Sequence, residues 1–301
     1  MRGLNVQVAT ASTPTCAPVI ARARLRRGNI ASHAGSARLL AQSISTVRAA
    51  GAAGQVMARA DSAFFVAKFL AAAVRANAWF SVTARMNPKV VAAIASIDED
   101  EWTAIKYPQA VFDEQAGGWV SDAQVAEVAF TAFTSLPKDQ QITCRLVVRR
   151  VKRLQPRTSD GSVQGELFTD WRHHAFVTNS TLGTVEADAR HRDHAIVEQV
   201  IAELKDGPLA HLPSGSYAAN AAWVAFAALA FNHARAATIA AGMATARWAT
   251  VRRRIIIVPA RLATTGRRLL MHLPEHWPWA TAWTALWNAI TTTGPPPAAT
   301  T

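Results

Sequence analysis

The chain has 301 residues, enough for two or three domains or for one domain with a large insertion. Half of the residues are hydrophobic, which argues against a disordered protein. Lys and Arg total 32 against 20 Asp and Glu, and the net charge of +12 favours an anionic partner, nucleic acid before a membrane surface. The two cysteines form neither a disulfide framework nor a zinc module, so a reducing cytoplasm is the simplest compartment.

The acidic residues are unevenly distributed. No Asp or Glu precedes Asp61 and only Glu275 follows Asp206, so nineteen of the twenty acids lie between them. Both flanks are therefore basic, which suits a nucleic-acid binder. An Arg-rich, acid-free N-terminus is also typical of an organellar transit peptide, but alternating apolar residues in 4–9 and 19–25 favour strands. The apolar run 221–231 is too short to span a bilayer, so we expect no membrane partner.

The first hundred residues predict an α/β arrangement. The expected elements are a strand hairpin of 4–10 and 19–26, a helix over 36–50, a strand over 56–60, a helix over 62–77, a strand over 80–84 and a helix over 88–97.

The pattern changes at Asp98, where strand candidates predominate. They are 109–112, 126–133, 142–151 and 173–178, and they predict a β-rich insertion over 98–180. A long helix over 184–205 ends before Gly207 and Pro208, and an Ala-rich helix over 220–241 and a strand over 255–258 follow. The expected domains are a core in two parts (1–97 and 181–242), the insertion between them, and a basic, Trp-rich region (243–301) whose end we expect to be disordered.

Asp61 is the first candidate for chemistry. It directly follows a short apolar strand, and active sites of α/β proteins collect where strands end. An aspartate at this place can equally be the N-cap of the next helix. Position alone leaves both interpretations open.

The predicted helix over 184–205 carries the second group of candidates. His191, His194, Glu198 and Lys205 fall within an arc of roughly 60° at 100° per residue. The adjacent arc is apolar and would pack on the sheet. The alternative is a solvated polar face with ordinary local ion pairs.

These two segments resemble known motifs. Residues 191–205 are similar to the Tyr-x2-Arg-x3-Glu-x6-Lys motif of a superfamily of bacterial insertion-sequence transposases of the DDE type. Glu198 and Lys205 match its Glu and Lys, whereas His191 and His194 stand where the superfamily has Tyr and Arg. Residues 59–65 resemble the strand of its second Asp, 80–86 its next strand and 247–262 a C-terminal block, so the resemblance extends over 2–280.

The resemblance implies an incomplete ribonuclease-H-like mixed sheet flanked by helices, with the β-rich insertion and a helical C-terminal region. It implies DNA transposition by phosphodiester cleavage and strand transfer at a two-metal Mg²⁺ site. Asp61 and Glu198 would be metal ligands, Lys205 would contact DNA near the cut, and His191 and His194 would donate to phosphate. The partners would be double-stranded DNA (terminal inverted repeats and target) and, in a full-length form, a second copy, in a cytoplasmic, nucleoid-associated setting.

Three further expectations complete this picture. The first catalytic Asp of the family precedes the hairpin, and because no acid precedes Asp61 we expect an N-terminally truncated, inactive chain. The alternatives are a non-catalytic, DNA-binding transposase remnant and a ribonuclease-H-like nuclease. Arg252, Arg253 and Arg254 lie in the acid-free tail and predict DNA-backbone binding, or else a solvated basic surface. The pairs His173–His174 and His191–His194 also allow a zinc site.

Overall fold

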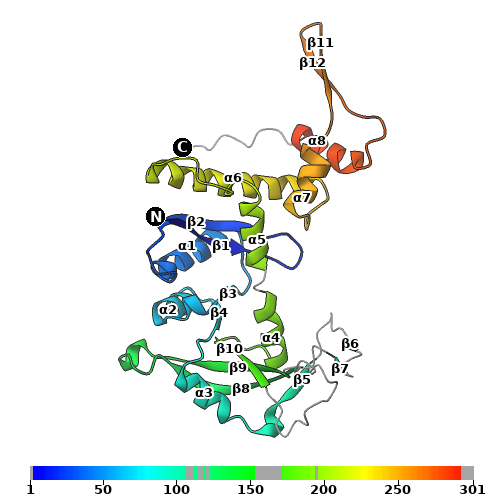
Figure 1. Cartoon of the computed structure of the whole chain (residues 1–301). Coiled ribbons are helices and arrows are strands. Elements are labelled where there is room, and N and C mark those ends of the chain that lie inside the picture. Colours follow the sequence, from blue (N-terminus) through cyan, green and yellow to red (C-terminus); the bar gives the residue numbers. More distant parts are fainter. Residues whose placement is uncertain are drawn as a thin grey trace, which may run out of the picture. The chain divides into compact units, whose positions relative to one another are not determined.

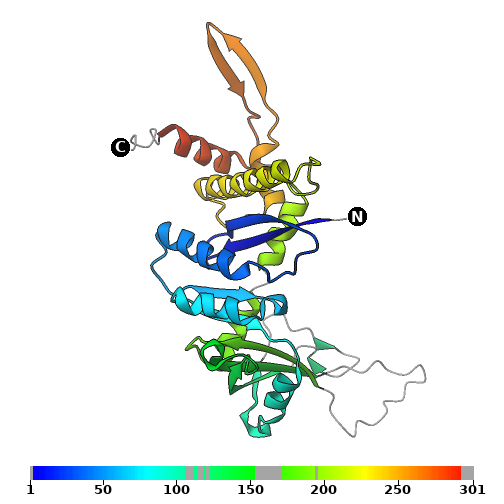
Figure 2. The same cartoon turned by 90° about the vertical axis from the view of Figure 1, so that its left-hand side faces the viewer.

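The computed structural model describes residues 3–105, 112–113, 118–119, 123–152, 171–193 and 196–292 (Figures 1 and 2). The chain divides into two compact units. We call Ile30–Ala195 the central unit, and Met1–Asn29 together with Ile196–Thr301 the terminal unit.

The central unit is built on a six-stranded mixed sheet in the order β3-β4-β10-β9-β8-β5. Its strands are β3 (Met57–Ala60), β4 (Trp79–Thr83), β5 (Thr103–Ile105), β8 (Ala123–Ala132), β9 (Ile142–Lys152) and β10 (Trp171–Thr178). β3 and β4 are parallel, and the other neighbouring pairs are antiparallel. Strands β6 (Phe112–Asp113) and β7 (Gly118–Trp119) pair separately. β3, the strand that leads to Asp61, is thus an edge of the main sheet.

Helices pack on both faces of this sheet. They are α1 (Ser36–Ala49), α2 (Ala67–Arg75), α3 (Pro88–Ala95) and α4 (Thr184–Arg192), with 3₁₀ turns η1 (Ser62–Phe64), η2 (Glu99–Glu101) and η3 (Lys138–Gln140). Leu146 and Val148 of β9 face a core shared with Leu70 of α2 and Val90 of α3. Val147, which points to the opposite face, packs with α4. α1 lies beside α2 (Figure 2).

The terminal unit begins with an antiparallel hairpin, β1 (Leu4–Ala11) and β2 (Val19–Arg27). Its other elements are α5 (Ile196–Lys205), α6 (Tyr217–Ala240), α7 (Trp248–Val251), a π-helical turn η5 (Arg252–Ile256), the hairpin β11 (Arg261–Thr265) and β12 (Arg268–His272), and α8 (Ala280–Thr292). Val200 of α5 and Phe231 of α6 pack on Ile20 of β2. The Asn232 side chain joins α6 to β2, because it accepts from the Ile20 N–H at 2.8 Å and donates to the Ile20 carbonyl at 2.9 Å.

The α/β class with a mixed sheet and flanking helices is confirmed. The hairpin of 4–10 and 19–26 and the strand and helix of 80–97 are also present, within a few residues. Asn87 caps α3 by accepting the N–H groups of Lys89 and Val90, both at 3.1 Å, and Pro88 occupies the first turn, where a missing N–H costs nothing.

Three element predictions are wrong. The helix expected over 62–77 begins only at Ala67, because Val66 is extended after η1. The strand expected over 255–258 is replaced by η5, in which Ile255 packs against Val251 one turn earlier. The helix expected over 184–205 is divided into α4 and α5, which belong to different units. The strand expected over 109–112 lies mostly outside the described residues, as does the chain end beyond 292.

The main strands of the β-rich stretch 98–180 do not form a separate sheet. β5, β8, β9 and β10 extend the sheet that β3 and β4 begin. The compact units divide the chain after residues 29 and 195, whereas the domain boundaries predicted at 97, 180 and 242 stay predictions. In the described part of the chain, no helix is both long and apolar enough to cross a membrane.

α3 provides a matched test of the central core. Val90 is fully buried and its neighbour Val91 is 49% exposed. We expect Val90→Ala to lower the free energy of unfolding by about 2 kcal/mol, because it removes buried methyl groups and leaves a cavity. Val91→Ala should change it by less than about 0.5 kcal/mol. Urea denaturation measures both, and equal losses would contradict this packing.

Candidate functional site

Asp61 lies at the end of β3, at the edge of the central sheet. Its side chain is exposed, and Oδ1 accepts the N–H of Ala63 at 2.9 Å, which caps η1. The N-cap interpretation of the sequence is therefore confirmed. It does not compete with metal binding, because a carboxylate that caps with one oxygen still has lone pairs for a cation.

Two arginines are fixed close to this strand end. Arg59, two residues before Asp61, donates to the Arg190 carbonyl at 2.8 Å and lies 3.5 Å from an Asp193 oxygen. Arg85 follows β4 and donates through Nε to the Ser62 carbonyl at 3.0 Å. The edge at Asp61 therefore carries guanidinium groups held by backbone carbonyls, and such groups suit a phosphate ligand.

Glu198 and Lys205 lie on α5 in the terminal unit, and both are exposed. Seven residues separate them, which is close to two helical turns, so they share one face of α5. The opposite face buries Val200 and Leu204. The structure therefore places Glu198 and Lys205 on one face of α5, and it places Asp61 in the other unit.

The second acid of this helix has a different role. Glu203 forms an ion pair with Arg235 of α6, whose side chain is 4% exposed, and a Glu203 oxygen lies 3.4 Å from the N–H of Trp248. Arg235 also donates to the Ala246 carbonyl at 2.6 Å. Glu203 thus holds α5, α6 and the start of α7 together, which leaves Glu198 as the exposed acid of the helix.

His191 lies at the end of α4 inside the central unit and is only 7% exposed. Its ring stacks on Phe176 at a centroid distance of 4.1 Å, and Nδ1 and Nε2 lie 2.8 and 3.2 Å from the hydroxyls of Ser81 and Thr83. The predicted phosphate contact of His191 stays a prediction, and these surroundings do not favour it. His194 lies outside the described residues. The prediction that these side chains share one face of a single helix is wrong, because His191 lies on α4 and Glu198 on α5.

The three consecutive arginines of the tail begin the turn η5. Arg252 and Arg253 are exposed and line a cavity of about 340 Å³ together with Asp206, Trp248 and Trp277. Arg254 is half-buried over the ring of Trp279, at 5.3 Å from its centroid. Arg252 and Arg253 are therefore available to an anionic ligand, whereas Arg254 mainly packs.

Charge is concentrated in the terminal unit. It contains fourteen Lys and Arg against four Asp and Glu, so it carries +10 of the net charge of +12. The central unit is nearly balanced, with eighteen basic and sixteen acidic residues. A polyanion would therefore be attracted mainly to the terminal unit.

A family model described as transposase DDE domain group 1 matches residues 14–295. The chain belongs to this family. A comparison with curated proteins gives no match. The mixed sheet flanked by helices agrees with the ribonuclease-H-like fold of DDE transposases, and the family implies DNA as the partner and a divalent metal as the cofactor.

The ligand set for that metal is not gathered in the ranges that the structure describes. Across them, no three side chains of His, Cys, Asp or Glu come close enough to hold an ion. Asp61 and Glu198 each provide an exposed carboxylate of the kind that suits Mg²⁺. Their assignment as metal ligands, and the zinc alternative, stay predictions.

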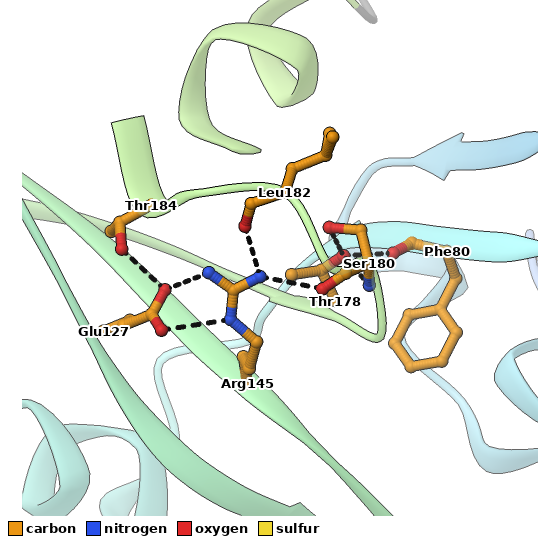
Figure 3. A network of polar contacts seen from close by, with 7 residues as sticks. All are labelled: Phe80, Glu127, Arg145, Thr178, Ser180, Leu182 and Thr184. Carbon is orange, nitrogen blue, oxygen red and sulfur yellow. Dashed lines mark hydrogen bonds and ion pairs between the residues drawn. The ribbon is translucent and has the colours of Figure 1, made fainter. Parts of the chain in front are cut away.

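The transposase domain also has polar contacts that sequence analysis missed. Arg145 of β9 forms a two-pronged ion pair with Glu127 of β8 and donates to the carbonyls of Ser180 and Leu182 at 2.8 and 2.7 Å (Figure 3). Thr184, the first residue of α4, donates to the same carboxylate at 2.8 Å. Burial raises the pKa of Glu127, but the hydrogen bonds from Arg145 and Thr184 outweigh it and lower the pKa. This network positions α4 on the sheet.

A second carboxylate, on α4 itself, is completely buried. Asp188 is 0% exposed and accepts from Arg149 of β9 and Arg192 of α4, both at 3.0 Å.

Arg149 also affects a histidine of the neighbouring strand β10. Burial, with Arg149 and Arg172 nearby, lowers the pKa of His174. The sequence contained a signal for this arrangement, because Arg145, Val147 and Arg149 occupy the same face of a predicted strand.

We expect Asp188→Asn to lower the free energy of unfolding by about 3 kcal/mol, because it leaves two guanidinium groups without their buried counter-ion. The control is Glu186→Gln on the same helix, whose ion pair with Arg190 is about half exposed on both sides. That substitution should change stability little. Guanidinium denaturation measures both, and a stable Asp188→Asn variant would show that the carboxylate is dispensable.

Proposed function

We propose that this DDE-family chain is the catalytic region of an insertion-sequence transposase of the Tyr-Arg-Glu-Lys superfamily. The main support for this proposal is the exposed face of α5. Glu198 and Lys205 lie there two turns apart, opposite the buried Val200 and Leu204. This is the Glu-x6-Lys spacing of the superfamily motif, and its solvent exposure is what a DNA-contacting face requires.

In this proposal each candidate has a role in phosphodiester chemistry. Asp61 and Glu198 provide oxygen ligands to Mg²⁺, which when bound activates the attacking hydroxyl and stabilises the leaving oxygen. Lys205 lies about 10 Å from Glu198 along the helix axis, so it binds a phosphate neighbouring the reacting one. Arg252 and Arg253 hold the backbone further along the duplex.

The family chemistry uses three carboxylates, and residues 1–60 contain no Asp or Glu that could be the first of them. We therefore propose that these 301 residues bind DNA without completing the catalytic site by themselves. This corresponds to the DNA-binding remnant among the possible functions.

We expect the purified chain to bind duplex DNA and to leave supercoiled plasmid uncut in the presence of Mg²⁺. Gel mobility and plasmid nicking measure the two properties. Nicking without end specificity would instead support a ribonuclease-H-like nuclease. Nicking that Glu198→Gln abolishes and Glu186→Gln retains would show a complete site and overturn the proposed inactivity.

The metal ligands can be located without any catalysis. Fe²⁺ bound in place of Mg²⁺, with ascorbate and peroxide, cleaves the backbone beside its ligands. We expect cuts beside Asp61 and Glu198 that excess Mg²⁺ suppresses, because both ions prefer oxygen donors. Glu198→Gln should weaken both cuts and Glu186→Gln should leave them unchanged. Cuts at other acids only would contradict the assignment of Asp61 and Glu198.

A homodimer of the full-length form and a nucleoid-associated, cytoplasmic location complete the proposal. Terminal inverted repeats come in pairs, so a full-length form that joins two ends is expected to act as two copies. Sedimentation of the DNA-bound full-length form at a monomer mass would contradict the dimer.

A further inference from the structure

The hairpin β11–β12 is exposed almost everywhere. Every residue of both strands is exposed except Ala263, which is half-buried, and the two strands form a sheet of their own. Both views show the hairpin extending away from α7 and α8 of the same unit (Figures 1 and 2). An isolated two-stranded hairpin is only marginally stable in water. Contact with a partner surface would therefore stabilise this hairpin.

The register gives the hairpin two different faces. Arg261 stands opposite His272, and Thr265 opposite Arg268, so these side chains share one face. The other face carries the pairs Leu262–Met271 and Thr264–Leu269. The first face, which we call the basic face, has cations at its two ends and the apolar pair Ala263–Leu270 between them. The opposite face is mainly apolar.

Nothing acidic lies near these cations in the sequence. Between Asp206 and Glu275 there is no Asp or Glu. No ion pair involving Arg261, Arg267 or Arg268 occurs in the part of the chain that the structure describes. These guanidinium groups are thus available to an external anion, in the unit that carries most of the net charge.

The turn at the tip adds an independent observation. Gly266 and Arg267 have φ values of +50° and +68°, the left-handed pair that joins two strands with a tight two-residue turn. Gly is usual at such positions because it has no Cβ to clash, and Asn because its short polar side chain can hydrogen-bond locally. Arg267 therefore places a cation at the tip at some cost to the turn, which indicates that the charge serves a partner.

We propose that β11–β12 is a DNA-binding arm whose basic face lies along a groove of duplex DNA and contacts phosphates through Arg261, Arg267 and Arg268. The major groove is about 12 Å wide and admits a two-stranded ribbon. This inference rests on the proposed function, because it takes DNA as the ligand. The apolar face would suit a second copy instead, but the guanidinium groups of the basic face and of the tip point to an anionic ligand.

The test measures the affinity of the full chain for a labelled 20-base-pair duplex over a series of salt concentrations. One variant replaces Arg261, Arg267 and Arg268 with Ala. The matched control replaces three other exposed cations, Arg38, Lys68 and Arg75, so that both variants lose the same charge. We expect the arm variant to bind at least tenfold more weakly, and its salt slope to fall by about 0.9 for each phosphate that the arm no longer neutralises. The control should change affinity less than twofold.

A single substitution separates charge from folding. Arg267→Gly relieves the left-handed backbone, so we expect thermal stability to be kept or raised while DNA affinity falls and the salt slope decreases by about 0.9. A merely structural role for Arg267 would leave the affinity unchanged.

The outcomes are distinguishable. Equal losses of DNA affinity in the arm variant and the control would overturn the assignment of the hairpin as a DNA-binding arm. They would leave the proposed function intact. If even the unaltered chain does not bind duplex DNA, the proposed function fails as well. Unchanged DNA affinity, with a dimer that Leu262→Ser and Leu269→Ser dissociate, would assign the hairpin to a second copy instead.

Discussion

A guanidinium group keeps its charge when it is buried, so a carboxylate beside it offsets the loss of water. Arg26, which is 9% exposed, donates instead to the Asn5 amide oxygen at 3.0 Å. Arg150 illustrates the pairing with a carboxylate. It is 5% exposed, lies between the rings of Trp102 and Trp171, and donates to both oxygens of Glu99 at 2.9 and 2.6 Å. The hydrogen bond from Arg150 in turn lowers the pKa of Glu99. The strand β9 also carries two half-buried arginines, Arg145 and Arg149, and each is paired with an acid.

This pairing explains much of the uneven charge distribution. Glu99, Glu127 and Asp188 are committed to arginines of the central sheet, and Glu203 to Arg235. The tail beyond Asp206 has one buried arginine, Arg235, and its acid comes from α5. With almost no acids of its own, that tail remains strongly positive, and Arg252, Arg253 and the arginines of the β11–β12 hairpin are exposed to water.

The sequence predicted what local pattern determines and missed what depends on distant partners. The hairpin β1–β2 and helix α3 were predictable because alternation and the Asn87–Pro88 cap are local signals. That β8 to β10 join β3 and β4 in one sheet was not, because strand order is set by packing between segments far apart in the chain. The buried roles of His191 and Asp188 depend in the same way on Ser81, Thr83 and Arg149, which lie on other elements. In the candidate site, the exposure of Glu198 and Lys205 on one face followed from helical spacing alone.

The two acids of α5 show how one helix can separate structure from chemistry. Glu198 and Glu203 are five residues apart, which turns them by about 140° around the axis. One therefore points to Arg235 and the interior, and the other to solvent. The surrounding unit carries +10 and attracts DNA, which brings phosphates towards an exposed carboxylate of the same sign. A divalent cation between the two removes that repulsion. A carboxylate exposed on so positive a unit is thus compatible with the divalent cation that the family implies.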